Sequence, residues 1–333
     1  MTDLNRENRV KNARLGMFIG DALAMPAHWY YNTRALRLDY GEITEFCAPR
    51  NPHPDSILWR SRYTPSGPRA DILHGQEVYW GMRGIHYHQF LRAGENTLNL
   101  QLANRLLLLL DHGEYSPERW LQCLIEFMTT PGRHKDTYVE EYLRHFFTRY
   151  GQGTPPSKCG RKDEKHVGGL CLLLPLFLTP ESVGREAAFD HLALTHGGAF
   201  MREGAALVAD VLCDALAGRP LAEAILDHCA NSGPEYANQA YQQLTSFPDQ
   251  KVIGRHFSSA CYLDHALPAV FYLAVKYRDQ PEAALIANTM CGGDNCGRGA
   301  VLGALLGAAS ADWCWPRRWC DGLVNPPPLL VTD

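Results

Sequence analysis

The sequence predicts an all-α fold, a compact bundle of many helices, and two observations support this prediction. Apolar residues recur every three or four positions along most of the chain, which is the spacing of amphipathic helices. The alternation typical of strands is confined to two weak candidates, 43–49 and 249–254. Short loops separate the helical segments, as in a bundle. No break in composition and no long internal repeat divides the chain, so we expect residues 1–333 to form one domain.

The helical segments can be followed along the chain. The first ends before Pro26, because proline disrupts a continuing helix. In 97–115 the leucines share one face and Gly113 lies at the polar end. Pro117 occupies the first turn of the next segment, where proline is tolerated. The further helices expected, in chain order, are 97–115, 117–130, 137–150, 200–218, 221–232, 265–277 and 281–290.

Prolines and polar residues interrupt residues 47–76, and we expect this segment to be irregular. A long irregular loop in a compact domain is often a lid or a binding loop. A surface excursion without a function would have the same composition, so the sequence leaves both interpretations open.

Composition and charge exclude several classes of protein. The formal net charge of −4 gives no basic field for nucleic acid or anionic lipid. The charged start lacks the apolar core of a secretory signal, and apolar runs such as 169–178 are shorter than the ~20 residues of a membrane span. The eleven cysteines include no C-x-x-C pair, and their odd number fits reduced thiols. We therefore expect a cytoplasmic protein without nucleic-acid or membrane partners, whose oligomeric state stays open.

The segment CGGDNCGRGAVLGALLGAA (291–309) joins a polar loop to a helix of small residues. Gly299, Gly303 and Gly307 recur every four residues and share one helix face, which would let another helix approach closely. Asp294 stands at or near the helix N-terminus, where a carboxylate caps free N–H groups. A cap on a buried helix and a binding loop both explain this pattern. No strand precedes the loop, which argues against a nucleotide-binding glycine loop.

Four segments, in order, resemble the ADP-ribosylglycohydrolase family, which includes dinitrogenase reductase-activating glycohydrolase and the hydrolases of ADP-ribosyl-arginine and ADP-ribosyl-serine. Residues 291–309 are similar to the family's G-G-D-x-D-T loop and the small-residue helix after it. LGMFIGDALAMPAHW (15–29) is similar to the opening G-x-x-x-G-D-A-L-G-x-P-x-E. AGENTLNLQLANRLL (93–107) stands where the family has T-D-D-T-x-x-x-x-A, and THGGAFMREGAALVADVL (195–212) resembles its T-H segment.

The resemblance implies an α-helical bundle with a binuclear magnesium site in a cleft. The T-D-D-T motif and the G-G-D-x-D-T loop would supply the metal ligands. ADP-ribose would bind over the metals, and the bond from ribose C1″ to an amino acid or other leaving group would be hydrolysed. The implied partner is a small-molecule or ADP-ribosylated substrate.

The chain departs from the family pattern at the metal positions. Glu95 and Asn96 replace the aspartates of T-D-D-T, D-x-D-T becomes D-N-C-G from Asp294 onward, and HVGGLCLL (166–173) lacks the asparagine and arginine of G-N-G-x-x-M-R. Two carboxylates, Glu95 and Asp294, would leave about two charges of a binuclear Mg²⁺ site unbalanced, and a cysteine is too soft a ligand for Mg²⁺. The sequence therefore predicts either one divalent ion, with Mg²⁺ as a candidate, on Glu95 and Asp294, or no metal.

The catalytic candidates are Glu95, Asp294 and His28, which takes the place of the opening motif's glutamate. Glu95 and Asp294 would be the acid/base or metal-ligand carboxylates, with Glu95 activating water for attack on an oxocarbenium-like carbon. His28 would orient or protonate the substrate, and Asn96 would position the sugar. A packed or surface histidine is the alternative for His28, and we expect Asp21 to brace its helix.

Further substrate-binding candidates flank these motifs. Trp29, with Tyr30 and Tyr31, could stack on a base or sugar, or pack in the core. His196 belongs to the T-H segment, where a structural hydrogen bond is the alternative. Arg298 could meet a phosphate, or lie at the surface as an ordinary arginine. The remaining candidates of this kind are Gly293, Asn295 and Asn96.

A softer metal site is a further alternative. His86 and His88 fall on one side of the chain if the backbone there is extended. With Glu95 and Cys296 they would offer ligands suited to zinc.

Two functions fit these observations. The first is a glycohydrolase with a remodelled site that acts on an ADP-ribosyl or other ribose-containing substrate. The second is a catalytically inactive relative that binds ADP-ribose or a nucleotide, or serves structurally like the family's crystallin-like members. The lost aspartates favour the second function, whereas their polar, reactive replacements favour the first. Convergence of Glu95, Asp294 and His28 on an open cleft would support the enzyme, and a cleft filled by leucine or phenylalanine would oppose it.

Overall fold

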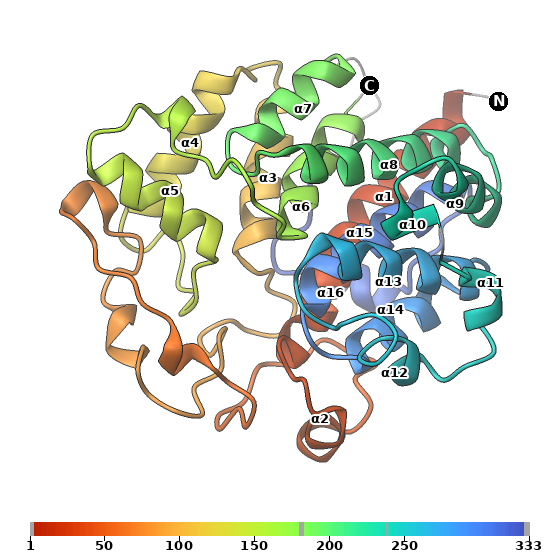
Figure 1. The fold of residues 1–333 in the computed structure, drawn as a ribbon, viewed down its shortest axis with the longest axis horizontal. Coiled ribbons are helices and arrows are strands. Elements are labelled where there is room, and N and C mark those ends of the chain that lie inside the picture. Colours follow the sequence, from red (N-terminus) through yellow and green to blue (C-terminus); the bar gives the residue numbers. More distant parts are fainter. Residues whose placement is uncertain (1–2, 180–182, 238, 330–333) are drawn as a thin grey trace.

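The computed structural model describes residues 3–179, 183–237 and 239–329, and the regular elements of these residues are helices (Figure 1). The α-helices are α1 (Asp3–Ala24), α2 (Thr33–Tyr40), α3 (Leu98–Asp111), α4 (Pro117–Thr129), α5 (Glu141–Gly151), α6 (Gly168–Phe177), α7 (Arg185–Ala193), α8 (Ala199–Leu216), α9 (Leu221–Ala230), α10 (Pro234–Ala237), α11 (Tyr241–Leu244), α12 (Asp249–Val252), α13 (Leu263–Lys276), α14 (Pro281–Met290), α15 (Asn295–Ala309) and α16 (Arg317–Gly322). Extended pairing in the same residues is limited to isolated bridges. The all-α prediction is confirmed.

The seven helices predicted from periodicity correspond to α3, α4, α5, α8, α9, α13 and α14. Both strand candidates are wrong, because residues 249–252 form α12 and residues 43–49 are irregular. Helix α6 was not predicted from the sequence. It is apolar and buried on nearly all sides, so it lacks the polar face on which helical periodicity depends.

Helices α1 and α15 pack directly against each other near the middle of the molecule (Figure 1). Glycines face each other across this contact, which we call the α1–α15 seam: Gly20 meets Gly299, and Gly16 meets Gly303. A Cβ atom added at Gly303 would lie 2.0 Å from the Gly16 oxygen, so the position has no room for a side chain. The close helix approach predicted from Gly299, Gly303 and Gly307 is confirmed.

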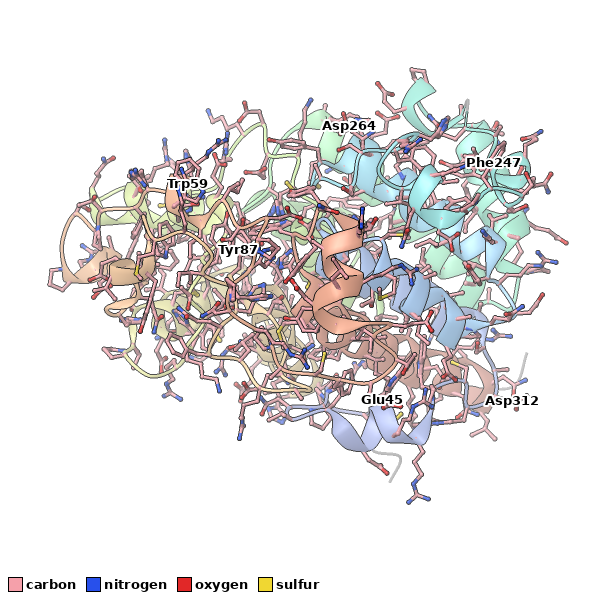
Figure 2. All side chains as sticks on the ribbon, turned by 90° about the horizontal axis from the view of Figure 1, so that it is seen from below. Glu45, Trp59, Tyr87, Phe247, Asp264 and Asp312 are labelled. Atoms are coloured by element: carbon pink, nitrogen blue, oxygen red, sulfur yellow. The ribbon has the colours of Figure 1, made fainter. Side chains whose placement is uncertain are left out.

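The other elements form two unequal sides around the seam. Helices α6, α8, α13 and α14 contact α15, whereas α4 and α5 lie on the far side of α3 together with the irregular chain that precedes it (Figure 1). Figure 2 shows Trp59 and Tyr87 on this loop-rich side, and Phe247 and Asp264 on the helical side. Among the described residues, no helix combines the length and apolar character that crossing a membrane requires.

The irregular segment 47–76 contains only short 3-10 turns, η2 (Leu58–Arg60), η3 (Pro68–Ala70) and the start of η4 (Gln76–Tyr79). Its irregularity was predicted correctly. Ile72 and Leu73 are fully buried in the main core. The segment is therefore anchored in the core at these residues, although most of its other residues are exposed or half-buried.

Candidate active site

The loop before α15 is held against the turn that follows α1. The Trp29 N–H donates to the Gly293 oxygen (2.8 Å), and the Gly293 N–H donates to the Tyr30 oxygen (2.7 Å). Gly292 and Gly293 adopt φ values of 59° and 64°, and a Cβ at Gly292 would lie 2.0 Å from the Tyr30 oxygen. Only glycine meets both conditions. This pairing brings Asp294, the next residue, alongside the turn after α1.

Asp294 is a buried carboxylate between two imidazole rings. Its Oδ1 accepts the Gly297 N–H at 3.2 Å, which is the helix cap predicted from the sequence. His28 Nε2 lies 3.4 Å from Oδ1, and His166 Nε2 lies 3.2 Å from Oδ2. Burial acts to raise the pKa of Asp294, but His166 and His28 outweigh it and hold the pKa well below its usual range. Asp294 is therefore ionised at neutral pH.

Three polar atoms at this contact, His28 Nε2, His166 Nε2 and Asp294 Oδ2, take part in these ion pairs but form no well-aligned hydrogen bond within the described part of the chain. All three residues are less than one-tenth exposed. Buried ionisable groups that shift one another's pKa in this way often belong to a catalytic or ligand site. We call His28, His166 and Asp294 the imidazole–carboxylate group.

His166 precedes α6, and its two ring nitrogens have different neighbours. Nδ1 accepts the Gly168 N–H at 2.9 Å, whereas Nε2 lies 3.3 Å from Glu140 Oε2 as well as close to Asp294. Burial opposes charge on this ring, but the negative charge of Glu140 outweighs it and raises the pKa of His166. Because an N–H already points at Nδ1, Nε2–H is the donor of this ring that faces the two carboxylates.

His28 is also bonded on its other side. Its Nδ1 lies 2.6 Å from His88 Nε2, and His88 Nδ1 lies 2.7 Å from Asp136 Oδ1. His86 Nε2 donates to the Pro26 oxygen at 3.1 Å. The nitrogens of His86 and His88 are thus engaged by protein groups. The softer metal site expected from them with Glu95 and Cys296 is not formed.

Glu95 lies apart from the imidazole–carboxylate group in its bonding. Its carboxylate accepts the Arg92 N–H at 2.6 Å and forms ion pairs with Arg92 (3.0 Å) and Lys135 (2.8 Å). Burial acts to raise the pKa of Glu95, but Lys135 and Arg92 lower it. Among the described contacts, none of its hydrogen bonds or ion pairs reaches Asp294 or His28.

Asn96 and Asp21 join α1 to the start of α3. The Asn96 Nδ2 donates to Asp21 Oδ2 and to the Phe18 oxygen, both at 2.8 Å. The Thr97 N–H and hydroxyl also donate to Asp21, at 2.9 and 2.6 Å. Asp21 therefore braces two helices, as expected.

Asn295 and Arg298 hold the loop before α15 in place through buried hydrogen bonds. Arg298 is fully buried and donates to Asn288 Oδ1 (3.3 Å), the Ser259 oxygen (3.0 Å) and the Gly292 oxygen. The Asn295 Nδ2 donates to the oxygen of Thr289 in α14 at 3.0 Å. The alternative of an ordinary surface arginine is wrong, because Arg298 is an internal clamp on the loop that carries Asp294.

Trp29 and His196 are surrounded mainly by aromatic rings. Trp29, 7% exposed, meets Tyr87 and Tyr138 edge-on with ring centroids 4.4 and 4.7 Å away. His196 lies 4.2 Å from Tyr142 by ring centroids, and its Nδ1 is 2.8 Å from the Thr195 hydroxyl. These contacts fit core packing for Trp29 and a structural hydrogen bond for His196, which are the alternatives to substrate binding.

A pocket of about 170 Å³ is lined by His166 of the imidazole–carboxylate group and by Cys261, whereas Asp294 and His28 are not part of its described lining. Arg161, Lys165 and Tyr262 line its wall, and its described lining includes no leucine or phenylalanine. Ligand sites commonly measure roughly 300–1,000 Å³, so this opening has room for part of a substrate. Two larger pockets, about 480 and 520 Å³, are lined by other parts of the chain.

Several residues of this site were not predicted from the sequence. His166 begins the HVGGLCLL segment, so its motif position was the signal that could have found it. Glu140, Asp136 and Cys261 lie in no motif, and only the folded chain brings them to the histidines.

An all-α bundle that presents a buried aspartate at the start of a glycine-rich central helix is the architecture expected of an ADP-ribosyl-type glycohydrolase. A family model described as ADP-ribosylglycohydrolase matches residues 2–331, so the chain belongs to the ADP-ribosylglycohydrolase family. It is also similar to a solved structure titled "ADP-ribosylglycohydrolase-related protein complex", over 96% of this chain and 93% of that chain, with a TM-score of 0.57 and 20% identity. That likeness shows the fold alone. Among curated proteins, no match was found.

The family generally uses divalent metal ions, but the residues at the expected magnesium positions do not fit two ions. Glu95 is paired with Arg92 and Lys135. The Asn96 amide is turned into α1, and the Cys296 thiol donates to a backbone oxygen of that helix. Mg²⁺ requires several hard oxygen ligands in octahedral geometry, which these side chains do not supply.

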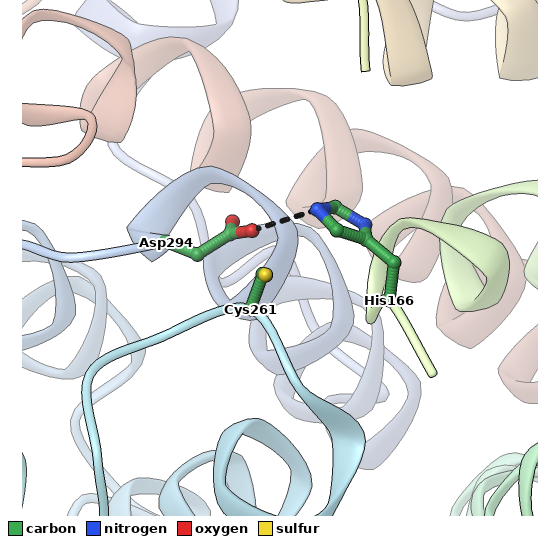
Figure 3. A group of neighbouring side chains, drawn as sticks. All are labelled: His166, Cys261 and Asp294. Carbon is green, nitrogen blue, oxygen red and sulfur yellow. Dashed lines mark ion pairs between the residues drawn. The ribbon is translucent and has the colours of Figure 1, made fainter. Parts of the chain in front are cut away.

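One group of the described residues could hold a single metal ion: His166, Cys261 and Asp294, whose donor atoms lie within 4.8 Å of one another (Figure 3). Nitrogen, sulfur and oxygen donors suit zinc better than magnesium. The tautomer of His166 opposes this use. Its Nε2, the atom that would bind the ion, carries the ring proton because the Gly168 N–H occupies Nδ1.

Proposed function

We propose that this chain is a glycohydrolase that cleaves the N- or O-glycosidic bond of an ADP-ribosyl or related ribose-containing substrate without a binuclear magnesium site. Membership of the family supports the reaction class. The observation that carries the metal-independent form is the imidazole–carboxylate group, a buried, ionised aspartate that forms ion pairs with two histidines at 3.4 and 3.2 Å. A cytoplasmic setting and a substrate other than nucleic acid belong to the proposal, supported by the net charge of −4.

In the proposed reaction, His28 and Asp294 divide the acid and base work. The bond from ribose C1″ to the leaving nitrogen or oxygen breaks as His28 Nε2–H gives its proton to the leaving atom. The ionised Asp294 stabilises the positive charge that develops on C1″. Water then bonds to C1″ and loses a proton to Asp294. Transfer of that proton across the 3.4 Å to His28 Nε2 restores both groups.

Glu95 has a different place in this proposal from the one expected on sequence grounds. Its carboxylate is neutralised by Arg92 and Lys135, which makes it a poor base for activating water. We therefore propose that Glu95 stabilises the turn before α3, and that Asp294 is the reacting carboxylate.

Product release followed by mass spectrometry tests the proposal. Purified protein would be incubated with ADP-ribosyl-arginine, ADP-ribosyl-serine, O-acetyl-ADP-ribose and simple ribosides, each with Mg²⁺, Zn²⁺ or EDTA. We expect release that survives EDTA and that falls roughly 100- to 1,000-fold in Asp294→Asn. Asparagine also caps helices well, so this variant removes the charge while keeping the cap.

Glu95→Gln is the matched control, since it neutralises a second largely buried carboxylate. We expect it to reduce release less than about tenfold, below the usual 10²–10⁴-fold contribution of an acid or base. Release that requires Mg²⁺ or Zn²⁺, or a loss in Glu95→Gln as large as in Asp294→Asn, would contradict the proposal.

The inactive relative remains the second candidate, because the pocket beside His166 measures only about 170 Å³ and its described lining includes neither Asp294 nor His28. A protein that binds without reacting would release no product from any substrate of the panel. It would still bind ADP-ribose in isothermal titration calorimetry, and Asp294→Asn would change that affinity.

A further inference from the structure

His28, His88 and Asp136 form an unbroken row behind the imidazole–carboxylate group. The contacts measure 2.6 Å from His28 Nδ1 to His88 Nε2 and 2.7 Å from His88 Nδ1 to Asp136 Oδ1. The two imidazole rings are parallel to within 2° and their centroids lie 4.9 Å apart, a separation that a 2.6 Å contact between nitrogens reaches only when they meet in the ring planes, as an N–H···N bond requires. The three side chains are at most 2% exposed. With Asp294 the row runs from one carboxylate to another through two histidines.

The charges around His88 place the protons in this row. Burial opposes a charge on His88, but Asp136 outweighs it and raises the pKa of His88, with Asp21 and Glu140 adding to the effect. A protonated His88 donates from both nitrogens, to Asp136 through Nδ1 and to His28 through Nε2. His28 then accepts at Nδ1 and carries its own proton on Nε2, the nitrogen that faces Asp294.

His86 and His53 form hydrogen bonds with the backbone beside this row but carry no positive charge. His86 Nδ1 accepts the His88 N–H at 3.0 Å, and its Nε2 donates to the Pro26 oxygen. His53 Nε2 donates to the His28 oxygen at 3.0 Å. Burial lowers the pKa of His53 to about 4 and the pKa of His86 well below its usual range. The positive charge of the cluster therefore resides on His88.

We propose that Asp136 and His88 are a relay that fixes the tautomer of His28 and replaces the proton that His28 donates. This inference rests on the proposed function, in which His28 is the acid. As the His28 Nε2–H proton moves to the leaving atom, the His88 Nε2–H proton moves to His28 Nδ1. Both histidines end neutral and each holds one proton on Nδ1. When the proton of the attacking water reaches His28 Nε2 through Asp294, the His28 Nδ1–H proton returns to His88 Nε2, which restores the starting state. No isolated imidazolate forms on His28, which distinguishes a relay from a single neutral histidine.

The imidazole ¹⁵N spectrum of the full-length protein tests the relay without requiring turnover. Long-range ¹H–¹⁵N correlation of ¹⁵N-histidine-labelled protein at neutral pH reports the protonation of each ring nitrogen. We expect His88 to be doubly protonated and His28 to carry a proton on Nε2 alone. A neutral His88, or a proton on His28 Nδ1 alone, would overturn the relay, whether or not the protein proves to be a glycohydrolase.

Variants separate the two parts of the relay. Asp136→Asn removes the charge that keeps His88 protonated, and we expect a neutral His88 and a kcat lower by about 10²–10⁴-fold, with KM within about threefold. His88→Gln still offers an N–H to His28 Nδ1 but holds no spare proton, so we expect the His28 tautomer to persist while kcat falls.

His53→Gln is the control within the same cluster, because His53 bonds the backbone of His28 and not its ring. We expect it to leave the His28 tautomer unchanged. If Asp136→Asn leaves both rings unchanged in the spectrum, or shifts them no more than His53→Gln does, Asp136 and His88 are packing groups and the relay is refuted. If the spectra agree with the relay but no substrate is turned over, the relay stands and the proposed function fails.

Discussion

The α1–α15 seam and the imidazole–carboxylate group meet at the start of α15, yet the two regions are built in opposite ways. In the seam, glycine backbones pack so closely that no position faces room for a Cβ. In the imidazole–carboxylate group, large polar side chains meet through ion pairs at 3.2–3.4 Å that are not well-aligned hydrogen bonds. The comparison indicates that the tightly packed seam fixes the backbone of Asp294, so that its loosely paired side chain is held beside the two histidines.

The largest effect is expected from breaking the seam. Gly303→Leu would place a side chain where even a Cβ lies 2.0 Å from the Gly16 oxygen, and we expect the free energy of unfolding to fall by more than about 4 kcal/mol. Urea unfolding followed by circular dichroism would measure it. Gly184→Leu is the control, since a Cβ there meets nothing within 4 Å. Equal stability of the two variants would show that the seam can widen.

The next effect concerns Arg298, which joins the seam to the site loop. Arg298→Met keeps much of the apolar volume but leaves the Gly292 oxygen without its donor and the Ser259 oxygen with only the Asp294 N–H, and we expect a loss of about 3 kcal/mol. The same urea titration of Arg317→Met, an arginine whose side chain is 92% exposed, is the control. A loss in Arg298→Met no larger than in the control would mean that the loop holds its shape without the clamp.

We expect low pH to destabilise the protein through its buried histidines, because the glycines of the seam do not titrate. Burial lowers the pKa of His191 to about 3 and of His53 and His134 to about 4, from an ordinary value of 6.5. Below pH ~6.5 these histidines bind protons in the unfolded chain but stay neutral in the folded protein. The free energy of unfolding therefore falls by about 1.4 kcal/mol per pH unit for each ring.

This acid effect is measured from unfolding free energies between pH 7 and pH 5. His191→Gln removes one such ring and should reduce the slope by about 1.4 kcal/mol per pH unit. The exposed His112→Gln serves as the control. An unchanged slope in His191→Gln would indicate that His191 is protonated in the folded protein.

The smallest effect is expected at His53, which supports the site from the irregular segment. His53→Leu removes the donor to the His28 oxygen, and we expect a loss of about 1–2 kcal/mol. The conservative His53→Gln retains an N–H donor and should lose less than about 1 kcal/mol. Thermal unfolding resolves the difference, and equal losses in both variants would assign the effect to packing.

Local patterns in the sequence predicted much of the scaffold. The leucine spacing of 97–115 corresponds to α3, the glycine spacing of 299–307 forms the seam, and Asp294 caps α15 as expected. Four motifs in the right order also identified the family. These features depend on residues three to four positions apart or on short contiguous motifs, so a single sequence contains the information.

The composition of the candidate site was predicted only in part. Asp294 and His28 were expected together, and the structure places them 3.4 Å apart. No pattern indicated Asp136 or Glu140, which lie between α4 and α5 outside any motif. Glu95 was expected to converge with Asp294 and His28, but it forms an ion pair with Lys135 instead. Lys135 lies forty positions away in the chain, so no local pattern reveals this pair.

The sequence by itself determined the helices, the glycine face and the cap of α15, because the hydrogen bonds and side-chain spacings involved lie within one or two helical turns. Only the tertiary structure decided which polar side chains meet. His28, His88, Asp136, His166 and Asp294 come from five separate stretches of the chain. Their protonation depends on burial and on charges a few ångströms away, and both exist only once those stretches are packed together.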